Sequence, residues 1–140
     1  MASLTISGNG STLTLPAGID TLTGSTGDDI ITISGQFTGA EVNLGNGSGD
    51  KLVLDNYANT ATVSNTETVV GNSAADTITF GAAIAGAVVD LNEGSDKLVL
   101  ADGTNSVTLT DVETVVGGTG ADTITMGGSF GAANVSLGTG

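Results

Sequence analysis

The chain has 140 residues, of which fifteen are acidic and only two are basic, so its formal net charge is −13. It contains no cysteine, histidine or tryptophan, which excludes disulfide bonds, a zinc site of the usual kind and catalysis by a thiol or an imidazole. The charge repels nucleic acids and anionic membranes but attracts hard cations, whose preferred ligands are oxygens. Because 39% of the residues are hydrophobic, we expect one folded domain over 1–140 that is not an enzyme.

No segment is predicted to target the chain or to anchor it in a membrane. The first ten residues, MASLTISGNG, have neither the basic nor the apolar region of a secretory signal peptide. The longest apolar stretch, 80–89, is about half as long as a membrane-spanning helix and contains two glycines. We therefore expect no insertion into a membrane.

Short β-forming runs follow one another along the chain, separated by clusters of glycine, asparagine, aspartate and serine. The runs that define the pattern lie at 4–6, 12–15, 77–80, 87–91, 97–100, 106–110 and 113–116. Apolar and polar residues alternate in most of them, and no window has the 3.6-residue period of a helix. The sequence therefore predicts an all-β chain with about 15 short strands, a density typical of a solenoid of stacked parallel strands.

The chain is also an internal repeat. GSTGDDIIT begins at Gly24, GNSAADTIT at Gly71 and GGTGADTIT at Gly117, so these copies are 47 and 46 residues apart. Three repeats therefore fill one solenoid domain. They cover approximately 24–70, 71–116 and 117–140, the last one continued in phase by 1–23 of a next subunit.

A nonapeptide pattern, G-G-x-G-x-D-x-U-x with U a large apolar residue, recurs within these repeats. GGTGADTIT at 117–125 fits it at every defined position, GSTGDDIIT at 24–32 departs only at Ser25, and LPAGIDTLT at 15–23 keeps its second half. Weaker versions are GNGSGDKLV at 45–53 and LNEGSDKLV at 91–99. These copies resemble the RTX, or haemolysin-type, calcium-binding repeat, and the resemblance extends over nearly the whole chain.

In the RTX family the first six residues of a nonapeptide form a calcium-binding turn and the last three form a strand of a right-handed parallel β-roll. The resemblance implies that fold for this chain, with Ca2+ as its cofactor. Glycine permits a positive φ and exposes carbonyl groups, aspartate supplies a hard carboxylate, and the apolar residue anchors the turn in the core. The candidate calcium-binding residues are Asp20, Gly27, Asp29, Asp50, Glu67, Asp76, Gly94, Asp96, Glu113, Gly120 and Asp122.

A coil with two sides uses about 18 residues, so the turns before every second strand fall on one edge. Two trios of acids have this spacing, Asp29, Asp50 and Glu67, and then Asp76, Asp96 and Glu113. We predict that each trio lines one edge, with ions between successive coils, and that the trios lie on opposite edges because a repeat has five strands. A three-sided coil would scatter them. The acids expected to be solvated turn residues are Asp28, Glu41, Asp55, Asp90 and Asp102.

The two ends of the chain continue the same repeat, since residues 135–140 align with 89–94 and the first residue aligns with Ser95. An open strand ladder recruits further strands, and a head-to-tail contact that does not close produces a fibre. We therefore expect polymerisation through an apolar junction. A third acidic trio would cross this seam from Asp122 to Asp20 of the next copy, with Ala2 in its middle. The predicted junction residues are Leu4, Ile6, Val135 and Leu137.

The sequence thus predicts a calcium-binding structural protein that is secreted and forms an extracellular filament, as in a biofilm matrix, a surface layer or a coat. Its partners would be calcium and further copies of itself, and the resemblance implies type I export without an N-terminal signal peptide. One alternative is a fragment of a larger RTX adhesin, surface-layer protein or secreted enzyme. Another is an ice-binding solenoid, because Thr-x-Thr triplets recur at 12–14, 21–23, 77–79, 108–110 and 123–125.

Overall fold

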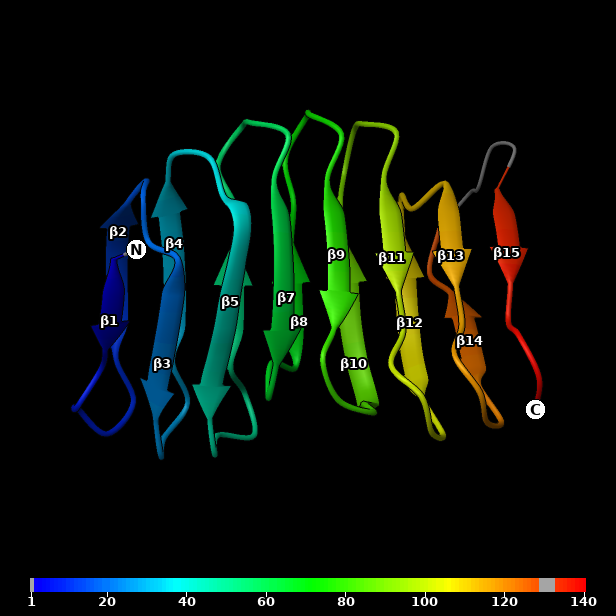
Figure 1. Ribbon diagram of the computed structural model, residues 1–140, viewed down its shortest axis with the longest axis horizontal. Coiled ribbons are helices and arrows are strands. Elements are labelled where there is room, and N and C mark those ends of the chain that lie inside the picture. Colours follow the sequence, from blue (N-terminus) through cyan, green and yellow to red (C-terminus); the bar gives the residue numbers. More distant parts are fainter. Residues whose placement is uncertain (1, 129–132) are drawn as a thin grey trace.

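Two parallel β-sheets lie face to face along the length of the molecule (Figure 1). The computed structural model describes residues 2–128 and 133–140. One sheet has eight strands, in the order β1 (Ser3–Thr5), β3 (Thr21–Ser25), β5 (Thr38–Gly45), β7 (Thr60–Ser64), β9 (Thr77–Phe80), β11 (Lys97–Val99), β13 (Thr114–Val116) and β15 (Asn134–Ser136). The other has seven, in the order β14 (Thr123–Met126), β12 (Ser106–Thr110), β10 (Ala85–Asp90), β8 (Thr68–Val70), β6 (Lys51–Val53), β4 (Ile30–Ser34) and β2 (Thr12–Pro16).

The chain changes sheet after every strand, so it winds as a two-sided solenoid in which each strand pairs in parallel with the next but one. This confirms the predicted all-β parallel solenoid and contradicts the three-sided coil. The strands of the two sheets run in opposite directions (Figure 1). Odd-numbered strands therefore begin at one edge of the solenoid, called here the odd edge, and even-numbered strands begin at the other, the even edge.

The core is a ladder of like aliphatic residues between the sheets. In the seven-stranded sheet Ile31 pairs with Leu52 and Leu52 with Val69, and all three are fully buried. Each such side chain contributes about 1.5–3 kcal/mol by leaving water. The runs predicted at 77–80 and 106–110 coincide with β9 and β12, because their alternation sets the inward side chains directly.

A β-bulge interrupts the strand register in β5, between Thr38 and Ala40, and in β10, between Ala85 and Ala87. The extra residue is a glycine in both strands, with φ of 82° at Gly39 and 84° at Gly86. No atom lies within 4 Å of a Cβ built at these glycines, so the backbone angle, not lack of space, requires glycine there.

The Thr-x-Thr triplets are divided between the two sheets. Those of β3 and β9 lie in the eight-stranded sheet, and those of β2, β12 and β14 in the seven-stranded sheet. No flat array gathers all of them on one face. Among the described residues no helix is long and apolar enough to cross a membrane.

Candidate metal centre

Acidic residues stand directly before the strands, where the chain turns into a sheet. The register of the strands places these turns in line, one coil apart. Two lines of acids result, the first row (Asp29, Asp50 and Glu67) on the even edge and the second row (Asp76, Asp96 and Glu113) on the odd edge. The predicted trios and their change of edge are confirmed.

Within a row, each carboxylate after the first accepts a hydrogen bond from the backbone of the acid one coil earlier. The N–H of Asp76 donates to Asp96 Oδ1 at 2.7 Å, and the N–H of Asp96 donates to Glu113 Oε2 at 2.6 Å. The first row is built in the same way, with distances of 2.6 and 2.9 Å. Side chains of one coil thus hold the turn of the previous coil in register.

Several of these carboxylates are buried without enough partners. Asp29, Asp50, Asp76 and Asp96 are at most 1% exposed. The Oδ2 atoms of Asp76, Asp96 and Asp122 are buried and have no hydrogen-bond partner. An ionised carboxylate in such a place is costly unless a cation compensates it.

The pKa values of these acids also reflect the cost of burying their charged form. Burial raises the pKa of Asp50 and that of Asp76 above the ordinary value of an aspartate. Burial also raises the pKa of Asp96 to about 6, and the charges of Asp76 and Glu113 add to this effect. Folding without a cation therefore shifts the protonation equilibrium of these acids towards the neutral form, and a bound cation would shift it back towards the charged form.

A small oxygen-lined space lies beside two of the unpartnered atoms. A methyl group on Gly71 would lie 2.7 Å from both Asp76 Oδ2 and the carbonyl oxygen of Leu91. One repeat later, a methyl group on Gly117 would lie 2.7 Å from both Asp122 Oδ2 and the carbonyl oxygen of Leu137. The cradle is thus open only because these residues are glycines.

This donor set fits calcium. Calcium takes six to eight oxygens and accepts mixtures of carboxylates, backbone carbonyls and water. Among the described residues, no group of three or more acidic side chains converges in the manner of a ready-made metal site. The ligands here would be one or two carboxylates of a row together with carbonyl groups of the adjacent turns.

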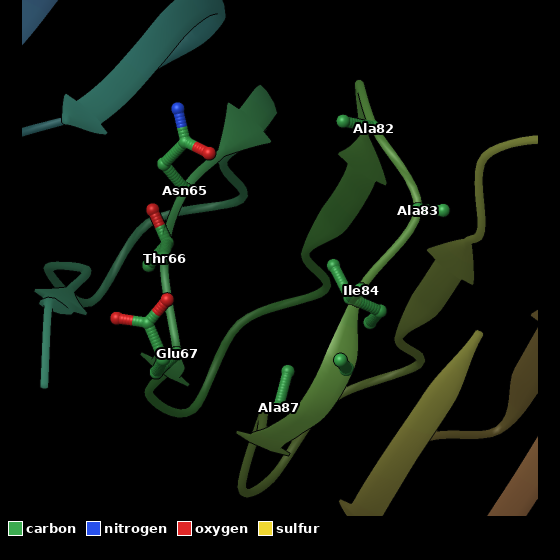
Figure 2. A pocket seen from close by; sticks show the side chains of 8 residues that line it. Asn65, Thr66, Glu67, Ala82, Ala83, Ile84 and Ala87 are labelled. Carbon is green, nitrogen blue, oxygen red and sulfur yellow. The ribbon is translucent and has the colours of Figure 1, made fainter. Parts of the chain in front are cut away.

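The first row ends at a cavity of about 160 Å³ beneath the bulge of β10. Asn65, Thr66 and Glu67 lie on one side of it, and the segment 82–87 lies on the other (Figure 2). Its wall carries one carboxylate opposite alanine and isoleucine side chains. This lining has no pair of groups suited to general acid–base catalysis.

Comparison with protein families agrees with this geometry. The family model described as the RTX calcium-binding nonapeptide repeat (4 copies) matches residues 17–32 and 109–125. The chain carries RTX calcium-binding repeats. No curated protein and no solved structure matched it.

The two matched segments are equivalent turns of the solenoid, one containing Asp20 and Asp29 and the other Glu113 and Asp122. Between them, Asp50, Asp76 and Asp96 occupy the same place before their strands. RTX repeats are calcium-binding structural units, so the cofactor of this fold is Ca2+. When bound, calcium supplies positive charge among the acids. The chain's own part is to hold the carboxylates in line and to exclude water from them.

The three glycines predicted at the calcium sites have different roles. Gly120 has a φ of 121°, as expected. Gly27 and Gly94 do not have positive φ values, so the expectation of a left-handed turn is wrong for them. A Cβ on Gly27 would lie 2.7 Å from the backbone nitrogen of Gly10, and one on Gly94 would lie 2.6 Å from Oδ1 of the buried Asp96. Glycine is needed at these two positions because neighbouring groups approach closely.

The last predicted acids lie near the two ends of the solenoid. Asp122 Oδ1 accepts the N–H of Asn105 at 3.2 Å on the even edge. Asp20 Oδ2 accepts the N–H of Ala2 at 2.5 Å on the odd edge. Each of these two hydrogen bonds has the same form as those that join successive acids in the rows. Because Asp122 and Asp20 lie on different edges, they do not belong to one line within a single molecule.

Sequence reasoning missed two kinds of polar residue on the edges. Asn59 and Asn105 are buried and stand in line with the acids. The sequence could have indicated them, because each lies 17 residues before an aspartate, Asp76 or Asp122, which is a spacing found within the rows. Asp28 and Asp102 are exposed, as expected, and in addition both accept backbone hydrogen bonds from the next coil. These two aspartates lie outside the rows and connect successive coils at the surface.

Proposed function

We propose that the protein is a secreted, calcium-stabilised structural subunit that polymerises head to tail into an extracellular filament. The observation that carries this proposal is the state of the two solenoid ends. β1 and β15 are the outer strands of one sheet, and β2 and β14 are those of the other. Such strands present unpaired backbone groups to solvent and attract further strands.

The C-terminal end also exposes apolar side chains that are buried elsewhere in the repeat. Val135 and Leu137 are 39% and 38% exposed, whereas Val89 and Leu91, the equivalent residues one repeat earlier, are fully buried. Another coil stacked on this end would cover them. At the N-terminal end Leu4 is half-buried and Ile6 is already buried, so Leu4 is the more available of the two predicted contacts.

A second copy of the chain fits this position in register. Inside the solenoid β9 pairs with β11, and Ile78 lies opposite Leu98. β14 is equivalent to β9, and β1 resembles β11 in sequence. Repeating the interior register across the seam would set Ile124 opposite Leu4 of the next copy. The same stacking would bring Asp122 into line with Ala2 and Asp20 of that copy.

Calcium would couple assembly to location. Without cations, a net charge of −13 opposes compaction, and ions that bind only the folded chain stabilise it by mass action. Low calcium in a cytosol would leave the folded chain only marginally stable, so that it unfolds readily for export. Millimolar calcium outside would stabilise the folded chain and its complementary ends. RTX proteins are typically exported by the type I route, which supports an extracellular place.

Negative-stain electron microscopy of the full chain in excess chelator and in millimolar calcium tests the proposal. We expect uniform thin fibres only with calcium. Leu137→Lys would place a charge in the seam and raise the concentration needed for fibres by at least about tenfold, the equivalent of losing one buried leucine. Thr62→Lys is the matched control, because Thr62 is exposed in the middle of β7.

Each outcome separates the parts of the proposal. Folded single particles in calcium would reject polymerisation and leave the calcium-binding solenoid, as expected for a fragment of a larger protein. Fibres that form equally well with Leu137→Lys would place the contact elsewhere. Fibres that persist in chelator would reject control by calcium.

A further inference from the structure

Asn59 holds its side-chain nitrogen among three oxygens. Nδ2 lies 3.0 Å from the carbonyl oxygen of Asp55, 2.6 Å from that of Tyr57 and 3.0 Å from Asp76 Oδ1. The residue is 1% exposed. Two carbonyl oxygens and one carboxylate oxygen thus surround a single buried nitrogen.

Asn105 repeats this arrangement one repeat later, on the opposite edge. Its Nδ2 lies 2.9 Å from the carbonyl oxygen of Ala101, 3.1 Å from that of Gly103 and 2.8 Å from Asp122 Oδ1. Asn105 is fully buried as well. The same oxygen cage therefore forms twice, from different neighbouring residues, which shows that the solenoid position dictates it.

The other end of the amide acts as the acids of the rows do. Asn59 Oδ1 accepts the N–H of Phe37 at 2.9 Å, and Asn105 Oδ1 accepts the N–H of Ile84 at 3.1 Å. An aspartate could accept these bonds equally well. It could not donate to the three surrounding oxygens, and its charge would lie against another carboxylate.

We propose that the amide groups of Asn59 and Asn105 take the place of a cation one coil before Asp76, where the second row begins, and one coil before Asp122. The nitrogen occupies a cage of oxygens of the kind that calcium prefers, and its two hydrogens are shared among the three oxygens without an ion. These two turns are therefore closed independently of calcium, whereas the acids that follow them depend on it. The inference rests on the calcium binding proposed for the rows.

The test is to replace the amide by a carboxylate and to count bound calcium. We would titrate the full chain with calcium by isothermal titration calorimetry, for the wild type, Asn59→Asp and Asn105→Asp. Each variant is expected to bind one calcium more than the wild type. Asn65→Asp is the matched control, since exposed Asn65 donates from Nδ2 to a single oxygen, Asn43 Oδ1, and it should bind the wild-type number.

Circular dichroism of the same samples in chelator gives a second measurement. Each Asp variant should lose its β signal at a lower temperature than the wild type in chelator and recover it when calcium is added. Folded variants that bind no additional calcium would overturn the inference. So would failure of both variants to fold in saturating calcium, because an ion should then close the cage. A wild-type chain that binds no calcium would instead reject the proposed function.

Discussion

The first and second rows differ at the turn where each begins, although Asp29 and Asp76 occupy equivalent positions. Asp29 Oδ1 accepts the N–H of Ser11 at 2.6 Å, and its Oδ2 accepts the N–H of Ser25 at 2.7 Å and the Ser25 hydroxyl at 2.9 Å. Asp76 Oδ1 is bonded to Asn59, but its Oδ2 has no partner. One carboxylate is satisfied by the chain itself, and the other is not.

The residue four places before the aspartate accounts for this difference. Ser25 stands where the nonapeptide pattern has its second glycine, and its hydroxyl reaches Asp29. The equivalent Asn72 turns away and donates instead to the carbonyl oxygen of Leu54. Serine in place of glycine at position 25 departs from the nonapeptide pattern, which suggests a weaker calcium site. The structure shows that the Ser25 hydroxyl instead gives Asp29 a hydrogen bond where an ion would otherwise compensate it. The two rows should therefore depend on calcium to different degrees.

The largest expected effect is on calcium-dependent stability after loss of a second-row carboxylate. Asp96→Asn should lose most of the stabilisation that one ion gives, about 3 kcal/mol when calcium exceeds its Kd a hundredfold. Asp29→Asn should lose less, because Asp29 already has hydrogen-bond donors. Urea unfolding followed by circular dichroism, with and without calcium, measures both.

The same unfolding curves contain a control. In chelator Asp96→Asn should be more stable than the wild type, because the variant buries no uncompensated charge. Equal losses of calcium-dependent stability in the two variants would contradict the difference between the rows.

The next effect concerns pH. Burial raises the pKa of Asp96 to about 6, so the folded state binds a proton more tightly than the unfolded state does. In chelator the free energy of unfolding should therefore fall as pH rises from about 4 to about 6. In calcium the trend should reverse, since protons compete with the ion. Unfolding midpoints between pH 4 and 7 measure both trends.

Asp96→Asn serves as the control for this pH dependence as well. The slope in chelator should become shallower but not disappear, because the pKa values of Asp50 and Asp76 are also raised. An unchanged slope would show that Asp96 is not the main titrating group.

A smaller effect is expected at Ser25. Ser25→Gly restores the full nonapeptide pattern but removes the hydroxyl that donates to Asp29, which should cost about 1–2 kcal/mol in chelator. In calcium the loss should shrink, because an ion can replace the hydroxyl. Ser7→Gly, at an exposed position outside the rows, controls for the added backbone freedom. A loss that calcium does not reduce would contradict the substitution of ion by hydroxyl.

The sequence was sufficient for the solenoid and for the lines of acids, because both follow from spacing. Alternating aliphatic residues placed β9 and β12 correctly, intervals of 17 to 21 residues placed the members of each row on one edge, and the odd number of strands in a repeat placed Asp29 and Asp76 on opposite edges. The partners of individual side chains could not be predicted in this way. Whether Ser25 reaches an aspartate and Asn72 turns away depends on rotamers that are chosen by the adjacent coil.

Glycine and asparagine show the same limit. The sequence suggested positive φ for all three predicted site glycines, but for Gly27 the requirement comes from residues 9 and 10 in another coil, and for Gly94 it comes from the buried carboxylate of Asp96 in its own turn. Asn59 and Asn105 lie outside the nonapeptide pattern, so only their position relative to the acids could have indicated them. Contacts between coils are long-range, and a local motif does not encode them.

The smallest expected effect is on the stability at low pH of a variant of Asp102, an acid outside the rows whose pKa is shifted in the opposite direction to that of Asp96. Asp102 is exposed, and its bonds from the N–H and the hydroxyl of Thr119, at 2.9 and 3.0 Å, lower its pKa. Its contribution to stability is therefore present above about pH 4 and is lost as pH falls through the lowered value, the opposite sign to that of Asp96. Asp102→Asn should hardly change the unfolding midpoint at neutral pH, since an amide oxygen can accept the same bonds. It should, however, flatten the decrease in stability between about pH 4 and pH 3. If the variant and the wild type lose stability equally in that range, the bond to Thr119 does not favour the charged carboxylate, and only burial distinguishes the acids of this solenoid.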